Sequence, residues 1–189
     1  RSSDLVLCAD IRDFRYDCPR ASYPGQDGDH GRDVIHYDPS DGRSGFSFTK
    51  LDANGDPLPA DATEWSCTRD EVTGLVWERK QDARGLHYGG NRYTWYEPDP
   101  LKNGGDAGVQ NGGECYFGNY APFSCDTAGL VERTRQEGLC GQEDWRLPTR
   151  EEIHSMVDYS SIHNEKYADY FSSYGSLFWS SDTYLASPD

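Results

Sequence analysis

Two clusters of acidic side chains have the residue types that could bind a metal ion. The first follows Gly25, and its carboxylates belong to Asp27, Asp29 and Asp33. The second is the segment 52–56, where the ligands would be Asp52, Asn54 and Asp56. Hard oxygen ligands of this kind suit Ca²⁺. Calcium is therefore the one cofactor that the sequence suggests.

Both clusters also have a simpler interpretation as solvated turns. An EF-hand calcium loop needs Gly at its sixth position and Glu at its twelfth. Counted from Asp52, Gly55 is the fourth residue and Thr63 the twelfth. The Asn54-Gly55 pair is instead typical of a hairpin turn, and closely spaced Gly and Asp residues are typical of turns in general. We expect turns at both places, with calcium as the alternative.

A loop within residues 97–124 contains aromatic side chains that could bind a ligand. These side chains are Tyr116, Phe117, Tyr120 and Phe123. They are held in place if Cys115 pairs with Cys125, and long connections in compact domains often carry function. Aromatic rings on such a loop could stack on a sugar or contact a protein. The alternative is a small satellite core beneath the loop. This loop is the strongest binding candidate in the sequence.

The remaining reactive residue types do not form a recognised catalytic set. Five histidines are scattered along the chain, and none stands in a known frame with Ser, Cys or Asp. His154 lies one helical turn from Glu151 and from Asp158, a spacing typical of an exposed ion-pair face. We therefore expect a protein that is not an enzyme.

Six cysteines, an even number, predict three disulfides and an oxidising compartment. No Cys-x-x-Cys motif occurs, which disfavours a zinc site. Short separation favours two of the pairs, and elimination leaves the third. The predicted pairs are Cys8–Cys18, Cys115–Cys125 and Cys67–Cys140. The rival pairing joins Cys125 to Cys140 across a predicted helix.

The composition excludes some classes of partner and favours a location outside the cytoplasm. A formal net charge of −15 without any Lys/Arg run disfavours nucleic acid and anionic membranes. No apolar run approaches the roughly 20 residues of a membrane span. No signal peptide is present, so we expect the chain to begin after processing. We predict a bacterial protein that is secreted, periplasmic or attached to the cell surface.

Two helices and several short strands must position these residues. Thr149 and Glu152 form a capping box, and Ile153 with Met156 begins the apolar face of the helix that follows. An earlier helix has Asp126 or Thr127 as its cap and ends at Gly138. Short apolar or alternating runs predict the strands. The predicted strands are 46–51, 75–78, 93–96 and 177–181.

The chain divides into an arm and one domain. Residues 1–45 read as an N-terminal arm with a small disulfide loop, and residues 46–189 as an α+β domain. Arg146 is expected to be structural and to pair with Asp144, Glu151 or Glu152, and its replacement should cost a few kcal/mol if that pair is buried. The side chains expected in the core and scaffold are Trp77, Trp95, Trp145, Arg146, Glu152 and Trp179.

Five sequence blocks, taken in chain order, resemble the Lcl C-terminal domain family, which is named for a bacterial collagen-like adhesin. The most specific block is Asp-Trp-Arg-Leu-Pro-Thr at residues 144–149, followed by Glu-Glu-Ile. The resemblance covers roughly residues 46–181. The blocks lie at residues 72–78, 93–96, 138–141, 144–153 and 178–181.

The resemblance implies a secreted or surface domain with C-type-lectin-like architecture. The fold class we expect is therefore α+β and C-type-lectin-like, loop-rich and disulfide-stapled, with short antiparallel strands and two helices. The named adhesin binds sulfated glycosaminoglycans, but this chain is strongly acidic and would repel such polyanions. We expect a non-catalytic binding or adhesion module whose ligand is a glycan or a protein.

The end of the chain suggests an alternative function. Members of the family continue after the Trp-Ser-Ser segment with another apolar strand, whereas this sequence stops at Asp189. The edge at residues 177–182 would then accept a strand from another chain. A candidate donor is Leu5-Val6-Leu7 of a neighbouring copy, which would build a head-to-tail polymer. The alternative is thus a structural subunit of an extracellular assembly, completed by strand exchange between copies.

Overall fold

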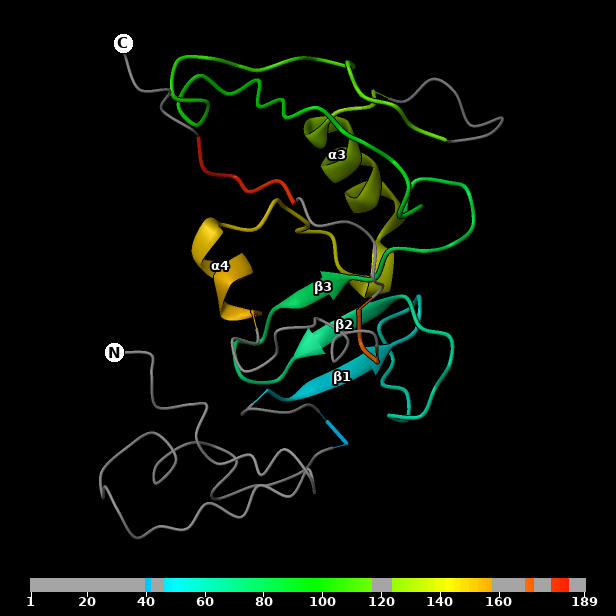
Figure 1. The fold of residues 1–189 in the computed structure, drawn as a ribbon. Helices are drawn as coiled ribbons and strands as arrows, with labels where there is room; N and C mark the ends of the chain where they lie inside the picture. The colour runs from blue at the N-terminus through cyan, green and yellow to red at the C-terminus, as the bar shows by residue number, and fades with distance from the viewer. Residues whose placement is uncertain (1–39, 42–45, 117–123, 158–168, 172–177, 184–189) are drawn as a thin grey trace, which may run out of the picture.

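A computed structural model of the chain describes residues 40–41, 46–116, 124–157, 169–171 and 178–183 (Figure 1). At its centre is a three-stranded antiparallel sheet in the order β1-β2-β3. The strands are β1 (Phe48–Leu51), β2 (Cys67–Asp70) and β3 (Val76–Glu78). In the register, Lys50 lies opposite Thr68, and Thr68 lies opposite Trp77.

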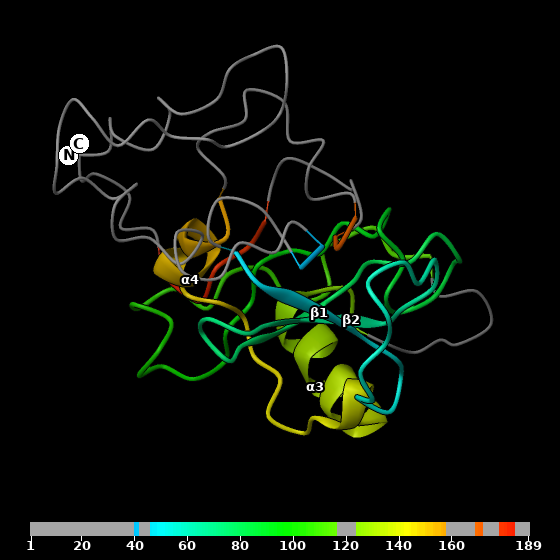
Figure 2. The same cartoon turned by 90° about the horizontal axis from the view of Figure 1, so that it is seen from below.

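Two helices follow the sheet, and each begins at a capping residue that the sequence predicts. The first is α3 (Thr127–Glu137), where the Asp126 side chain accepts from the Gly129 amide and Gly138 ends the helix with a left-handed φ of 62°. The second is α4 (Arg150–Ser155), which begins with the complete Thr149/Glu152 capping box. Figures 1 and 2 show α3 on one side of the sheet and α4 beyond its end.

The structure confirms an α+β, loop-rich fold stapled by disulfides. Two of the predicted pairs are present, Cys67–Cys140 and Cys115–Cys125, so the rival Cys125–Cys140 pairing is not formed. The predicted Cys8–Cys18 pair lies in the expected N-terminal arm, outside the described residues.

One face of the sheet packs on the turn that follows α3. Leu51 and the Cys67–Cys140 disulfide are buried together there. Val76 and Leu139 pack against them, and so does Trp145, whose indole N–H donates to the Leu139 carbonyl at 3.0 Å. Trp145 of the family signature therefore covers the disulfide.

The opposite face of the sheet packs on Trp65 and Tyr170. The Trp65 indole N–H donates to the Tyr170 carbonyl at 3.0 Å, and the Thr68 hydroxyl donates to the same oxygen at 2.6 Å. Lys50 is buried here, with its ammonium 4.1 Å from the centre of the Trp65 ring. It shares this face with Phe48 because strand side chains alternate.

The turn at residues 52–56 docks on the backbone of the Gly138–Gly141 block. The Cys140 amide donates to the Ala53 carbonyl at 2.9 Å, and a side chain on Gly55 would collide with the Cys140 carbonyl. Cys140 itself has a φ of 52°, which is uncommon for a residue other than glycine. Residues 138–141 therefore make a close backbone contact with the turn at residues 52–56, which is distant in the sequence.

Several predicted elements are shorter than expected or are absent. Residues 93–96 form two isolated bridges, from Thr94 to Asp126 and from Tyr96 to Gly108, instead of a strand, because one partner is a helix cap and the other lies in a loop. Residues 178–183 contain no strand either, and the Ser181 amide donates to the Pro148 carbonyl. The helix α4 ends at Ser155, before Val157.

Trp179 does not lie in the core, so this prediction is wrong. The indole is 51% exposed, because its segment does not join the sheet and its N–H reaches out to the Tyr93 carbonyl at 2.7 Å. Trp77 and Trp95 are half-buried. The Trp95 N–H donates to the Ser180 carbonyl at 3.1 Å and so attaches the same segment.

Arg146 has one of its expected partners but is more exposed than expected for a residue of the core and scaffold. Its guanidinium binds both carboxylate oxygens of Glu152, at 2.7 and 2.6 Å. The Arg146 side chain is nevertheless 50% exposed, so the pair is not buried and the larger loss of stability is not expected. Glu152 also accepts from the Thr149 amide at 2.8 Å. The hydrogen bond from Arg146 lowers the pKa of Glu152 to about 2, since it and Thr149 outweigh the effect of burial.

Arg146→Ala should lower the free energy of unfolding by no more than about 1 kcal/mol, because solvent screens the exposed pair. The substitution should also raise the pKa of Glu152 toward its ordinary value, which an NMR titration of the carboxyl would detect. Glu152→Ala should cost more, because it also removes the capping box. A loss of several kcal/mol in Arg146→Ala would contradict the assignment of an exposed pair.

Candidate functional site

The aromatic surface, as we define it, consists of Arg84, Tyr88 and Tyr116. The Tyr116 side chain is 44% exposed, and its ring meets Tyr88 edge-on with centroids 5.9 Å apart. The Arg84 guanidinium lies 5.3 Å from the centre of the Tyr116 ring. These three residues come from two loops, so the surface exists only in the folded protein.

The backbone beside Tyr116 is fixed from several directions. The Cys115–Cys125 disulfide ties it to the start of α3. Arg92 and Glu114 exchange two backbone hydrogen bonds of 2.8 Å, and the Tyr116 amide donates to the Asn91 side chain at 2.8 Å. Tyr116 is thus presented on a constrained loop. The other predicted members of this site, Phe117, Tyr120 and Phe123, lie outside the described residues.

The loop that carries Arg84 and Tyr88 is closed at its base. The Gln81 amide donates to the His87 carbonyl at 2.8 Å, and the Gly89 amide donates to the Gln81 carbonyl at 2.9 Å. From outside the loop, the Tyr93 hydroxyl donates to the Leu86 carbonyl at 2.8 Å. We call residues 81–89 the Gln81 loop.

His87 joins the Gln81 loop to the sheet and to α3. Its Nδ1 lies 2.7 Å from Glu78 of β3, and its Nε2 lies 3.0 Å from Glu137 of α3. Lys80 binds both carboxylate oxygens of Glu78, at 2.8 and 2.7 Å. Burial alone would raise the pKa of Glu78, but Lys80 and His87 together lower it to about 2. Burial and the charge of Lys80 lower the pKa of His87, but Glu78 and Glu137 outweigh them and raise it above 6.5.

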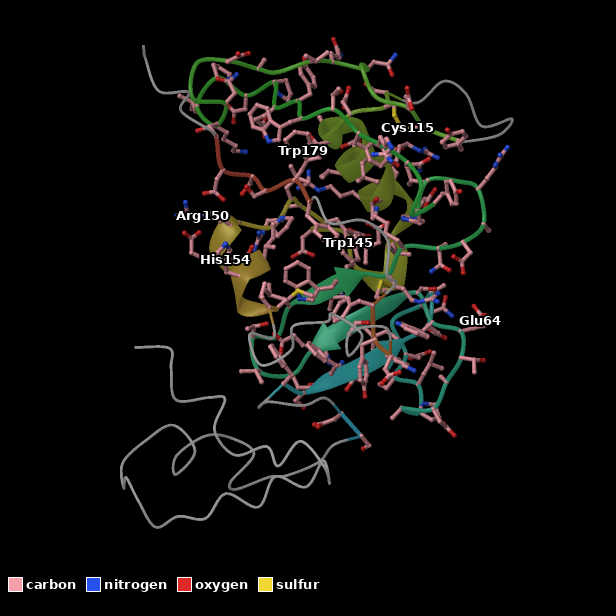
Figure 3. All side chains as sticks on the ribbon, in the orientation of Figure 1. Glu64, Cys115, Trp145, Arg150, His154 and Trp179 are labelled. Carbon is pink, nitrogen blue, oxygen red and sulfur yellow. A yellow bond between two sulfur atoms is a disulfide. The ribbon has the colours of Figure 1, made fainter. Side chains whose placement is uncertain are left out.

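A second exposed pair of rings, Phe178 and Trp179, lies outside the aromatic surface. Phe178 is 66% exposed. Figure 3 shows Trp179 and Cys115 in the same loop-rich part of the molecule, above the sheet. The Tyr93 carbonyl that accepts from Trp179 holds this pair to the segment that also supports the Gln81 loop.

The family model of the Lcl C-terminal domain matches residues 66–189, which is more than half of the chain. The chain belongs to the Lcl C-terminal domain family. No curated protein and no solved structure matches it. The family associates the chain with adhesins. β1 lies before the matched region of the Lcl domain and nevertheless pairs with β2.

The candidate calcium ligands of the second cluster lie before the matched region and form a turn, as expected. One Asp52 carboxylate oxygen accepts from the Asn54 and Asp56 amides at 2.8 and 2.9 Å. These hydrogen bonds lower the pKa of Asp52, and the bond from the Asp56 amide has the largest effect. Within the ranges that the structure describes, no group of three His, Cys, Asp or Glu side chains could hold a metal ion. Asp27, Asp29 and Asp33 lie outside those ranges.

Two further expectations concern the exposed ion-pair face of α4 and the absence of a membrane span. Glu151 and His154 lie on the exposed side of α4 as the sequence predicts, whereas Asp158 is outside the described residues (Figure 3). Among the helices that the structure describes in the Lcl domain, none has the length and apolar character of a membrane span.

Several residues that organise the site were not predicted from the sequence. Asp126 was predicted only as a helix cap, but it also accepts from the Ser124 hydroxyl and, at 2.8 Å, from the Asn111 amide. It therefore ties the loop before the Cys115–Cys125 disulfide to α3. Arg84, Tyr88 and His87 were not predicted, since their partners are distant in the sequence and no local pattern identifies them.

Proposed function

We propose that this Lcl domain is a secreted, non-catalytic binding or adhesion module, and that the aromatic surface contacts a glycan or a protein. The observation that carries the proposal is the exposed Tyr116 ring on a loop fixed by the Cys115–Cys125 disulfide. The disulfides support a location in an oxidising compartment. Membership of an adhesin-associated family supports the binding role.

The physical basis of the proposal is the low cost of ordering these side chains. Tyr116 is already packed against Tyr88 and Arg84, so it loses little conformational freedom when a ligand binds. An aromatic face can stack on the apolar face of a sugar ring, while Tyr and Arg are common among the residues that dominate protein interfaces. The surface therefore suits either kind of ligand.

Tyr116→Ala should weaken binding by about tenfold or more for any oligosaccharide that the wild-type domain binds, because removal of a central aromatic contact typically lowers affinity by this much. The measurement is a screen of the wild-type domain on an array of neutral and acidic oligosaccharides, followed by titration calorimetry. Val72→Ala is the matched control, since Val72 is also an exposed apolar side chain but lies in the turn between β2 and β3. Unchanged affinity in Tyr116→Ala would contradict the proposed surface.

The exposed Phe178 and Trp179 favour a second candidate function, a structural subunit of an extracellular assembly. In that case residues 177–182 would accept a strand or a neighbouring surface from another copy of the chain. Sedimentation of the wild-type protein as a polymer, and of Trp179→Ser as a monomer, would support it. A wild-type monomer at all concentrations would rule out assembly through this segment.

Calcium binding is a separate question for either function, and calorimetry with CaCl₂ alone tests it.

A further inference from the structure

The two contacts of His87 require that both of its ring nitrogens carry protons. Each nitrogen faces a carboxylate oxygen, at 2.7 Å from Glu78 and 3.0 Å from Glu137. A carboxylate only accepts hydrogen bonds, whereas a neutral imidazole has one donor and one acceptor nitrogen. Only the positively charged ring can donate to both partners at once.

The groups around His87 come from three parts of the fold. β3 contributes Glu78, and Lys80 lies two residues after it. The helix α3 contributes Glu137, whose other oxygen lies 3.8 Å from Arg133. The Tyr93 ring lies 5.9 Å from the Lys80 ammonium, and its pKa is raised by burial, so the phenol stays neutral near pH 7. Lys80 opposes a charge on His87, while the two carboxylates favour it.

We propose that His87 is a pH-dependent clamp, which holds the Gln81 loop against β3 and α3 while its ring is doubly protonated. The loop carries Arg84 and Tyr88, so the clamp also positions two of the three residues of the aromatic surface. The consequence for ligand binding rests on the proposed function, but the clamp itself does not.

Loss of the proton should open the contact to Glu137 first. The Glu137 side chain is 41% exposed and can be solvated by water, whereas Glu78 is only 16% exposed. A neutral His87 therefore keeps its proton on Nδ1 for the buried Glu78, and the Nε2 lone pair then repels the Glu137 carboxylate. The Gln81 loop would lose its attachment to α3 and keep the one to β3.

The sign of the pH dependence follows from the direction of the shift. The folded state raises the pKa of His87 above 6.5, so its stabilising contribution is complete below 6.5 and is lost as the pH rises through the folded-state value. Glu78 has a pKa of about 2 in the folded state, so its contribution is complete above its ordinary value of 4.5. The clamp therefore contributes its full stabilisation between pH 4.5 and 6.5.

Hydrogen exchange measured by mass spectrometry at about pH 5.5 and about pH 8 tests the clamp, after correction for intrinsic exchange rates. We expect the Gln81 loop to exchange about tenfold more slowly at the lower pH in the wild-type protein. His87→Gln should abolish that difference. His154→Gln, at an exposed histidine on α4, is the matched control and should retain it. Equal protection of the wild-type loop at both pH values would overturn the proposal.

A second variant and a second measurement separate the clamp from the binding function. Glu137→Gln should lower the pKa of His87, measured by NMR titration of its ring, and an unchanged pKa would count against the clamp. The oligosaccharide array is then read at both pH values. If loop exchange depends on pH but no oligosaccharide binds, the clamp stands and the glycan form of the proposed function fails. If binding occurs while loop exchange is independent of pH, the function stands and the clamp fails.

Discussion

The double variant Cys67→Ala/Cys140→Ala should lose about 4 kcal/mol of stability, because the disulfide closes a long loop in the unfolded chain. The two cysteines are 73 residues apart, and neither is exposed in the folded protein. Both are replaced together so that no unpaired thiol remains. The free energy of unfolding, measured by urea denaturation with circular dichroism, gives the loss directly.

The other described disulfide provides the comparison. Cys115 and Cys125 are only 10 residues apart, so the loop-closure model assigns the double alanine variant a smaller loss of about 3 kcal/mol. Removal of the Cys67–Cys140 disulfide also disturbs the packing of the buried cluster around it, which should increase the difference between the stability losses of the two double variants. Equal losses in the two double variants would show that loop closure does not govern the stability of this domain.

Trp65→Ala should lower the free energy of unfolding by about 3 to 5 kcal/mol, as is typical for removal of a large buried ring. Trp65 is buried between the Lys50 ammonium, 4.1 Å from the ring centre, and the Arg79 guanidinium at 4.0 Å. Its removal leaves a cavity and takes the ring away from both cations. Chemical denaturation of the variant measures the loss.

Trp65→Phe is the matched variant, since it keeps an aromatic ring and removes the indole N–H. The Tyr170 carbonyl would still accept from the Thr68 hydroxyl, so the lost hydrogen bond should cost only about 1 kcal/mol, with a further cost for the smaller ring. If Trp65→Phe were as unstable as Trp65→Ala, the hydrogen bond rather than the ring would be the main source of stability.

The helix boundaries could be predicted because their signals are local. The capping box needs only Thr149 and Glu152, and the end of α3 needs only a glycine at position 138. The strands were predicted less well, because pairing depends on partners elsewhere in the chain. Residues 93–96 have strand-like composition, yet they meet two separate partners and form no ladder. Trp179 was misplaced for the same reason.

The candidate site could be predicted only in part. Tyr116 stands out because it is an aromatic residue next to a cysteine in an irregular loop. The contact between His87 and Glu137 joins residues 50 positions apart, and no spacing rule indicates it. Lys50 looks like an ordinary polar residue of an edge strand, and only the fold shows that it is buried against Trp65. Such interactions depend on the tertiary arrangement and not on local sequence.

The long disulfide also decides what a protease could achieve against this domain. Leu101 and Lys102 are exposed in a loop that lies between Cys67 and Cys140 in the sequence, and exposed loops are preferred sites of proteolytic cleavage. Cleavage there would leave one fragment with Cys67 and another with Cys140, still joined covalently through the sulfur bridge. The nicked protein would migrate as a single species until a reductant is added. The domain could thus be cut in its loops without losing its sheet or its aromatic surface.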